Sequence, residues 1–215
     1  MRLTPRLLQE RLRAITDEIE DSHALHALAP LAVRFLPWTG FSMRPMAILA
    51  IINDIILLGR ETIVECGSGN SSVFAARALA HYGSPGRIHS IDHDPRWANQ
   101  TCDAIAAEHL QPWANVICAP LVDNWYDRTL LPRVRDIDLL IVDGPPAHER
   151  GTETARQAAL DEFSMYIQPG ATVLLDDTRR RGERIVPAAW EDRYNVKFHP
   201  HPGGCAMASW PRGNP

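Results

Sequence analysis

From residue 61 onward, short runs of β-branched and aliphatic residues alternate with helical stretches, and this alternation restricts the chain to one class of fold. The expected strands are TIVEC, RIHSID, ANVICA, DIDLLIVD and ATVLLDD, at residues 62–66, 87–92, 114–119, 136–143 and 171–177. The helical stretches between them lie at residues 71–81, 95–109 and 152–166, and a turn is expected at Pro169–Gly170. Strands that alternate with helices predict an α/β fold with a parallel sheet and right-handed crossovers.

The two ends of the chain have different patterns. Residues 4–19 predict a helix that Thr4 caps, with Pro5 at its first position and apolar residues at helical spacing. A second apolar helix is expected at 46–58. After a helix at 183–190, two strands at 194–199 and 205–210 lie close together in the sequence and predict a terminal antiparallel hairpin. We therefore expect an N-terminal helical extension over residues 1–60 and one domain over residues 61–215.

Composition excludes several classes of function. The net charge of −4 argues against a generic binder of nucleic acids. The longest apolar run, at 46–58, contains Asn53 and Asp54 and is too short to cross a bilayer, and the N-terminus has no apolar signal region. The four cysteines are scattered, which fits free thiols in a reducing compartment. These observations predict a cytoplasmic protein with neither a membrane nor a nucleic acid as partner.

Acidic or glycine-rich groups follow four of the expected strands. They are Glu65 to Gly69, Asp92, Asp143, and Asp176 with Asp177. In parallel sheets, ligands bind beyond the carboxyl ends of the strands. The sequence therefore predicts a ligand site where these groups meet.

The segment from Glu65 to Ser72 joins a strand to a helix. Gly67 and Gly69 allow a tight turn and let a ligand approach the backbone, whereas a plain connection between strand and helix is the alternative. An acidic residue precedes this loop, which favours a cationic ligand over a pyrophosphate. Asp92 has the spacing of an acid that accepts both hydroxyls of a ribose; the alternative is a helix cap, a role that suits Asp94 better.

Four segments, in this order and spacing, resemble class I S-adenosylmethionine-dependent methyltransferases, and within them O-methyltransferases and an uncharacterised bacterial branch. The segments are VECGSGNSS, IHSIDHDP, DLLIVDGPP and PGATVLLDDT. The resemblance implies a Rossmann-like, seven-stranded, mostly parallel sheet with helices on both faces and a reversed final hairpin. It implies S-adenosylmethionine as the cofactor, and the cofactor-binding residues it indicates are Glu65, Gly67, Ser68, Gly69, Ser71 and Asp92. PWTGFSM, at residues 37–43, resembles the stretch that covers the cofactor in some relatives, where Trp38 and Trp97 would contribute unless they are core residues.

Asp143, Asp176 and Asp177 resemble the metal-binding carboxylates of catechol- and caffeoyl-type O-methyltransferases. Two positions differ: the pair at the fifth strand is Asp-Asp rather than Asp-Asn, and Pro146 stands where catechol-type enzymes have a catalytic lysine. Hard oxygen ligands suit Mg²⁺ or Ca²⁺, of which Mg²⁺ is the expected ion. The alternative is that Arg179 or Arg180 neutralises the acids and no metal binds.

The candidate catalytic residues are Asp143, His148 and Asp177. His148 follows the DGPP segment and suits a base near neutral pH, although it could equally be a surface residue. Arginines follow the acid pair at positions 179, 180, 181 and 184, and either bind an anionic substrate or offset the acids.

We therefore expect methyl transfer from S-adenosylmethionine to a small-molecule acceptor, at a hydroxyl oxygen, and a homodimer is compatible with this. A module that binds the cofactor without turnover is the alternative. A short-chain oxidoreductase would need a Tyr-x-x-x-Lys pair, but the only lysine, Lys197, is three residues after Tyr194. A base-directed nucleic-acid methyltransferase would need an aromatic residue after Pro145-Pro146, where Ala147 stands.

Overall fold

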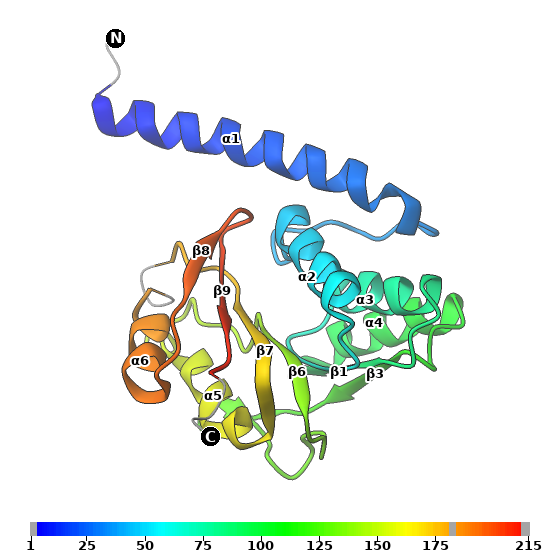
Figure 1. The fold of residues 1–215 in the computed structure, drawn as a ribbon. Helices are drawn as coiled ribbons and strands as arrows, with labels where there is room; N and C mark the ends of the chain where they lie inside the picture. Colours follow the sequence, from blue (N-terminus) through cyan, green and yellow to red (C-terminus); the bar gives the residue numbers. More distant parts are fainter. Residues whose placement is uncertain (1–3, 181–183, 212–215) are drawn as a thin grey trace.

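The computed structural model describes residues 4–180 and 184–211. Figure 1 shows a twisted sheet between helices, with one long helix lying across the top of the molecule. The sheet has seven strands in the order β3-β2-β1-β6-β7-β9-β8. They are β1 Thr62–Cys66, β2 Arg87–Asp92, β3 Ala114–Cys118, β6 Ile137–Val142, β7 Ile167–Leu175, β8 His199–His201 and β9 Cys205–Ser209.

Strands β3, β2, β1, β6 and β7 are parallel, whereas β9 pairs antiparallel with both β7 and β8. The predicted α/β class, the Rossmann-like seven-stranded sheet and the reversed terminal hairpin are therefore confirmed. The order places β2, β1, β6 and β7 side by side, so that the ends of these strands meet at one edge.

Helices cover both faces of the sheet. One hydrophobic cluster joins the sheet to α2 (Pro45–Leu58), α3 (Asn70–His81) and α4 (Pro95–Ala107). A second cluster, on the other face, joins it to α5 (Ala158–Phe163) and α6 (Ile185–Tyr194). Neighbouring residues of β1 divide between them, because Ile63 belongs to the first cluster and Val64 to the second. Every residue of β6 is buried, as predicted for this apolar run.

The N-terminal segment forms α1 (Pro5–Leu28), followed by the short helix η1 (Ala29–Leu31). Thr4 caps α1 as predicted, because its Oγ1 accepts a hydrogen bond from the backbone N–H of Leu7 at 3.3 Å. The division of the chain at residue 60 stays a prediction. Helix α2, which precedes that boundary, contributes Ile48 and Ile51 to the same core as the sheet.

Three local predictions were wrong. The helix expected at 152–166 is α5 with a short turn at each end, η2 (Ala155–Gln157) and η3 (Ser164–Tyr166). Pro169 and Gly170, where a turn was expected, lie inside β7, at a shift in the pairing register between β7 and β6. The strand expected from Tyr194 begins at His199, because α6 continues to Tyr194 and ends at Asn195 with a φ of 50°. The expected start of α6, Glu183, lies outside the described residues.

A small hairpin was not predicted. Strands β4 (Leu121–Val122) and β5 (Trp125–Tyr126) pair antiparallel across Asp123 and Asn124. These two turn residues have φ values of 52° and 64°, as a two-residue type I′ turn requires. Among the described residues, no helix combines the length and the apolar character needed to span a membrane.

Candidate functional site

The ends of four neighbouring strands form the candidate site. The sheet order brings together Glu65 of β1, Asp92 of β2, Asp143 after β6, and Asp176 with Asp177 after β7. Backbone hydrogen bonds continue past the strands: the N–H of Gly67 donates to Ile91 at 2.8 Å and the N–H of Asp143 donates to Cys66 at 2.8 Å. The predicted meeting of acidic strand ends is therefore present.

The glycine loop after β1 lies directly against the loop after β6. Gly67 has a φ of 104°, and a Cβ there would lie 3.4 Å from the backbone carbon of Asp143. At Gly144 a Cβ would lie 2.3 Å from the Tyr126 hydroxyl and 3.0 Å from the backbone nitrogen of Gly67. Both positions therefore require glycine. Beside Gly69 a Cβ would meet nothing within 4 Å, which leaves this side of the loop open.

Glu65 is fully buried beneath this loop. Its Oε2 accepts hydrogen bonds from Ser72 Oγ at 2.5 Å and from Ser90 Oγ at 2.6 Å. Its Oε1 has no hydrogen-bond partner within the described residues. Burial raises the pKa of Glu65, although hydrogen bonds from serine hydroxyls, among them Ser72 and Ser90, oppose this by stabilising the charged form. A buried acceptor of this kind is suited to a ligand that brings a cationic N–H donor.

Asp92 is almost buried at the end of β2. Its Oδ2 accepts from Ser68 Oγ at 2.6 Å, and its Oδ1 accepts from the backbone N–H of Asp94 at 3.0 Å. Asp94 caps α4 by accepting from the N–H of Arg96, as the sequence suggested. Each carboxylate oxygen has a second lone pair, so Asp92 retains the capacity to accept ligand hydroxyls.

The three aspartates proposed as metal ligands do form one cluster. One oxygen from each of Asp143, Asp176 and Asp177 lies within 4.8 Å of the others. Burial, reinforced by the charge of Asp177, raises the pKa of Asp176 to about 6. Burial also raises the pKa of Asp143 well above its usual range, and Asp176 adds to this effect. Crowded, buried carboxylates of this kind require a proton or a cation nearby.

Asp177 adopts a φ of 61°, in the left-handed region. Asp and Asn enter this region more readily than other side chains. The backbone therefore suits either residue, which accounts physically for an Asp where the resembled families have Asn. Arg180 Nη1 lies 2.7 Å from Asp177 Oδ2, so one of the two arginines suggested as neutralising groups does contact the cluster.

Arg156, which the sequence analysis did not single out, lies buried beneath the cluster. Its guanidinium donates to the backbone carbonyls of Pro145, Asp143 and Asp176 at 3.2, 2.7 and 3.2 Å. Its Nη2 also lies 3.4 Å from Asp143 Oδ1 and 3.3 Å from Asp177 Oδ2. Arg156 therefore joins the loops after β6 and β7 and supplies positive charge to the acids.

Tyr126 is a second residue that the sequence analysis missed. Its side chain is buried on β5, and its hydroxyl has no hydrogen-bond partner within the described part of the chain. The hydroxyl lies against Gly144, and burial, reinforced by the charges of Asp92 and Asp143, raises the pKa of Tyr126. The missed hairpin thus places a polar group at the centre of the candidate site.

Other predicted residues lie farther from the cluster. His148 is exposed, and no hydrogen bond to it occurs among residues 4–180 and 184–211; its role as a base stays a prediction. Arg179 pairs with Asp17 of α1 instead of the acid cluster. Arg181 lies outside the described residues.

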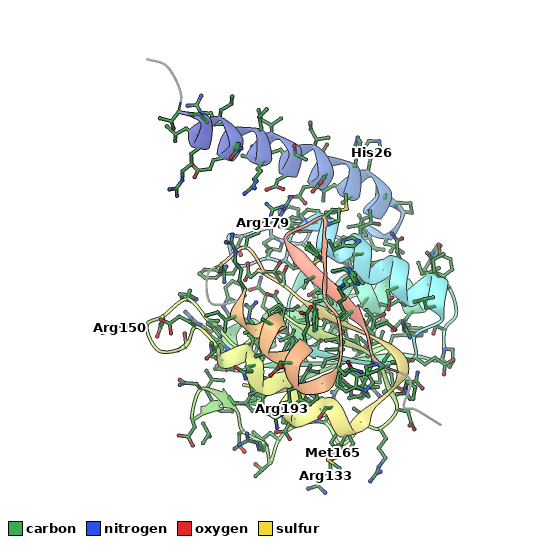
Figure 2. All side chains as sticks on the ribbon, turned by 60° about the vertical axis from the view of Figure 1, so that its left-hand side comes forward. His26, Arg133, Arg150, Met165, Arg179 and Arg193 are labelled. Carbon is green, nitrogen blue, oxygen red and sulfur yellow. The ribbon has the colours of Figure 1, made fainter. Side chains whose placement is uncertain are left out.

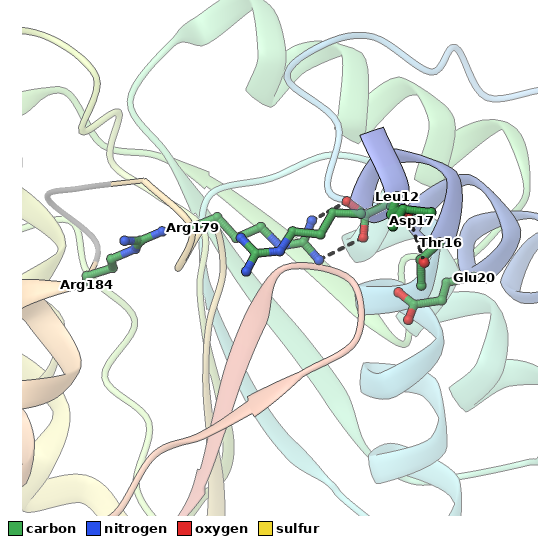
Figure 3. A pocket seen from close by; sticks show the side chains of 7 residues that line it. Leu12, Thr16, Asp17, Glu20, Arg179 and Arg184 are labelled. Carbon is green, nitrogen blue, oxygen red and sulfur yellow. Dashed lines mark hydrogen bonds and ion pairs between the residues drawn. The ribbon is translucent and has the colours of Figure 1, made fainter. Parts of the chain in front are cut away.

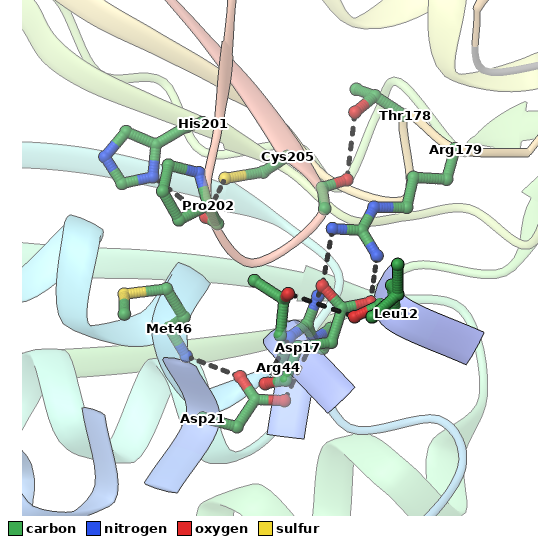
Figure 4. A network of polar contacts seen from close by, with 12 residues as sticks. Leu12, Asp17, Asp21, Arg44, Met46, Thr178, Arg179, His201, Pro202 and Cys205 are labelled. Carbon is green, nitrogen blue, oxygen red and sulfur yellow. Dashed lines mark hydrogen bonds and ion pairs between the residues drawn. The ribbon is translucent and has the colours of Figure 1, made fainter. Parts of the chain in front are cut away.

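Helix α1 is attached at the mouth of the site by ion pairs. Arg179 and Arg44 both contact the Asp17 carboxylate, and Arg44 Nε donates to Asp21 at 2.9 Å. Thr178 Oγ1 donates a hydrogen bond to the Gly204 carbonyl, in the β8–β9 turn, at 2.9 Å. Figure 4 shows this bond next to the ion pairs of α1. Beside them is a cavity of about 360 Å³, which Figure 3 shows between α1 and the loop after β7. It is lined by Leu12, Arg13, Thr16, Asp17, Glu20, Arg179 and Arg184.

Aromatic side chains border the glycine loop. Asn70 Nδ2, at the start of α3, donates to the Pro37 carbonyl at 3.1 Å, which places the segment at 37–43 next to the loop. The ring of Phe41 lies 6.2 Å from that of Trp97, and the ring of Trp38 lies 6.4 Å from that of Phe74. Phe41 is largely exposed, so the pair formed with Trp97 has a free surface beside the site.

A family model described as a methyltransferase domain matches residues 64–178, which is more than half of the chain. The search of curated proteins found no match.

Three solved structures share the fold. The methyltransferase PaMTH1 of Podospora anserina, bound to SAH, has a TM-score of 0.63 at 13% identity, over 99% of each chain. An O-methyltransferase of Bacillus cereus in complex with SAH has a TM-score of 0.60 at 14% identity, over 89% of this chain and 90% of the other. The O-methyltransferase TomG of Streptomyces achromogenes, in complex with SAM, has a TM-score of 0.55 at 18% identity, over 90% of each.

Proposed function

Because this chain belongs to the methyltransferase family whose model spans residues 64–178, we propose that it transfers the methyl group of S-adenosylmethionine to a hydroxyl oxygen of a small-molecule acceptor. The observation that carries the proposal is the unpartnered Oε1 of Glu65 beneath the glycine loop. The amino group of S-adenosylmethionine is a cationic N–H donor of the kind that this oxygen lacks. The SAM- and SAH-bound structures of the same fold support this choice of ligand.

The remaining cofactor contacts follow from the same edge of the sheet. Gly67, Ser68, Gly69 and Ser71 would face the methionyl part, where the absence of side chains at the glycines admits the ligand. Asp92 would accept the ribose hydroxyls, with Ser68 fixing its carboxylate. The exposed surface of Phe41 and Trp97 would cover the adenosine.

In methyl transfer the sulfonium supplies the electrophile, so the protein has to align the acceptor and accept its proton. Asp143 and Asp177 would hold the acceptor hydroxyl, and Asp143, whose pKa is raised by burial, is a stronger base than an ordinary aspartate and would receive the proton. His148 is the alternative base. Arg156 positions Asp143 through its backbone carbonyl, and its Nη2 also contacts the carboxylates of Asp143 and Asp177 directly.

The donor set of the cluster fits a divalent cation. Asp143, Asp176 and Asp177 offer only hard oxygen atoms, which suit Mg²⁺ and would hold it. When bound, such an ion lowers the pKa of an acceptor hydroxyl. Arg156 and Arg180 already supply positive charge to the same carboxylates, so a cluster that works without a metal is the alternative.

The cavity beside α1 supports a small acceptor. It opens next to Arg179, two residues after Asp177, and Arg13 and Arg184 also line it. Because Arg179 is paired with Asp17, Arg13 and Arg184 would supply the charge that favours an acceptor with a carboxylate or phosphate group. The second candidate function is a module that binds the cofactor without turnover, which Pro146 favours because catechol-type enzymes have a lysine there.

A cytoplasmic location is proposed from the free cysteines.

Calorimetry with S-adenosylmethionine, its demethylated product and NAD tests the cofactor assignment. We expect the first two to bind and NAD not to bind. Asp92→Ala should weaken binding by about 1–3 kcal/mol, as expected for losing hydrogen bonds to a charged group. Asp103→Ala removes an exposed acid from α4 and serves as the matched control. Equal affinity in both variants would reject the ribose assignment.

Gly67→Val tests the loop, since a β-branched side chain resists a φ of 104° and presses on the Asp143 backbone. Binding should be lost while the circular dichroism spectrum is retained. Turnover with a panel of hydroxylated acceptors then separates the enzyme from the binding module, because both bind the cofactor and only the enzyme releases the demethylated product.

A further inference from the structure

The apolar side of α1 is largely exposed and lies opposite the side that docks on the body, although Leu12 at its edge also lines the cavity beside Arg179. Leu8, Leu12, Ile15 and Ile19, which we call the apolar stripe, are 48–55% exposed. The residues of α1 that face the body are Asp17, Asp21, Ala24 and Leu28, which are partly or fully buried. At ~100° per residue, the centres of these two sets lie ~180° apart on the helix.

The figures agree with this orientation. His26 continues the stripe, seven residues after Ile19, and Figure 2 shows it pointing away from the body. Figure 1 shows that the first turns of α1 extend past the β8–β9 hairpin. The stripe therefore has no partner within the described residues, although its spacing of four, three and four residues is that of a helix seam.

We propose that the stripe binds the stripe of a second copy of this chain, in an antiparallel arrangement about a twofold axis. The sequence of the stripe is self-complementary in this direction. When Leu8 lies opposite the partner's Ile19, Leu12 lies opposite the partner's Ile15, so all four side chains meet an apolar residue. A twofold axis that relates the copies makes the interface isologous, as in most homodimers.

The charges beside the stripe determine the direction. Arg11 and Glu18 lie on the same flank, both are exposed, and neither has an ion-pair partner among the described residues. In the antiparallel register, Arg11 lies within two residues, or ~3 Å along the axis, of the level of the partner's Glu18. Each dimer thus gains two pairs of opposite charge. A parallel pair would set Arg11 beside the partner's Thr16 and gain no such pair.

The arrangement is compatible with the rest of the molecule. Leu8, Ile15 and Ile19 lie on the side of α1 opposite the body, so the two bodies lie on opposite sides of the helix pair. Ile15 does not line the cavity beside Arg179, so a substitution at this position leaves the lining of the cavity unchanged. The inference does not depend on the reaction that the chain catalyses.

Sedimentation velocity and light scattering of the full chain, from low to high micromolar concentration, test the proposal. We expect a species of twice the 24.0 kDa of one chain. Ile15→Asp should give a monomer with unchanged circular dichroism and unchanged cofactor affinity. Met165→Asp, on the side opposite α1 in Figure 2, is the matched control because Met165 is also an apolar residue and is more exposed; it should remain a dimer.

Charge reversal tests the direction. Arg11→Glu or Glu18→Arg alone should weaken the dimer about tenfold, since two attractive pairs become repulsive. The double variant should recover the original dissociation constant. A wild-type monomer throughout, a dimeric Ile15→Asp variant, or a double variant that fails to recover would each overturn the proposal. A monomer that binds anionic lipid vesicles through Ile15 would also overturn it, by assigning a membrane to the stripe.

Discussion

Asp176→Asn removes one buried carboxylate from the acid cluster and keeps the shape of the side chain. In the folded protein the pKa of Asp176 is raised to about 6, against 3.8 for an ordinary aspartate, by burial and the neighbouring Asp177. Because the folded pKa lies above the unfolded one, this residue stabilises the fold at low pH, and the contribution is lost as pH rises through about 6.

The magnitude follows from the shift. At 1.36 kcal/mol per pKa unit, the full contribution of Asp176 is about 3 kcal/mol. Between pH 8 and pH 5 about 1.4 kcal/mol of it should appear, because at pH 5 the carboxyl is protonated in the folded state and still mainly charged in the unfolded state. Asn has no charge to lose, so this part of the pH dependence should be absent in the variant.

Urea unfolding of both proteins at pH 5 and pH 8, in the presence of chelator, measures the effect. The measured quantity is the unfolding free energy of Asp176→Asn minus that of the wild type. We expect this difference to be about 1.4 kcal/mol larger at pH 8 than at pH 5. Asp103→Asn, at an exposed acid on α4, is the control and should show no such difference. A variant that is destabilised equally at both values of pH would refute the reasoning. Addition of Mg²⁺ at pH 8 should stabilise the wild type more than the variant if the cluster binds the ion.

Three further changes have defined outcomes. Arg156→Met should lower the unfolding free energy by about 3–5 kcal/mol, because it removes the buried cation beside the carboxylates and the donor to three backbone carbonyls, and urea unfolding checks this. Tyr126→Phe should raise the melting temperature of the cofactor-free protein. It removes a buried hydroxyl without a partner, which costs the folded state about 1 kcal/mol. Activity should disappear in chelator and return with Mg²⁺, Mn²⁺ or Co²⁺; full activity in chelator, with an intact Asp177→Ala enzyme, would assign the cluster to substrate binding or structure.

The strand ends that form the candidate site could be predicted from the sequence, because each is marked by a local pattern of residues. Strands β1 and β2 have the predicted bounds, since β-branched runs end there at an acid or a glycine loop. The meeting of Asp143, Asp176 and Asp177 then follows from strand order alone.

The residues that the sequence analysis missed depend on tertiary contacts. Tyr126 lies in a strand of two residues, which is too short to show a period, although Asp123-Asn124 could have indicated the turn. Arg156 stands in a stretch with helical spacing, where an arginine is expected to face solvent. It is buried only because the loops after β6 and β7 turn three carbonyl groups toward one place.

The attachment of α1 makes its two halves unequal in local stability. The buried side chains of the helix are Ala24 and Leu28, and the ion pairs to Arg44 and Arg179 begin at Asp17. In a monomer, amide hydrogens before residue 17 would exchange through fraying of the helix end, while those after it would be protected by docking. In the proposed dimer, protection would extend toward Leu8 and would increase with protein concentration. Hydrogen exchange along this one helix therefore reports association and docking separately.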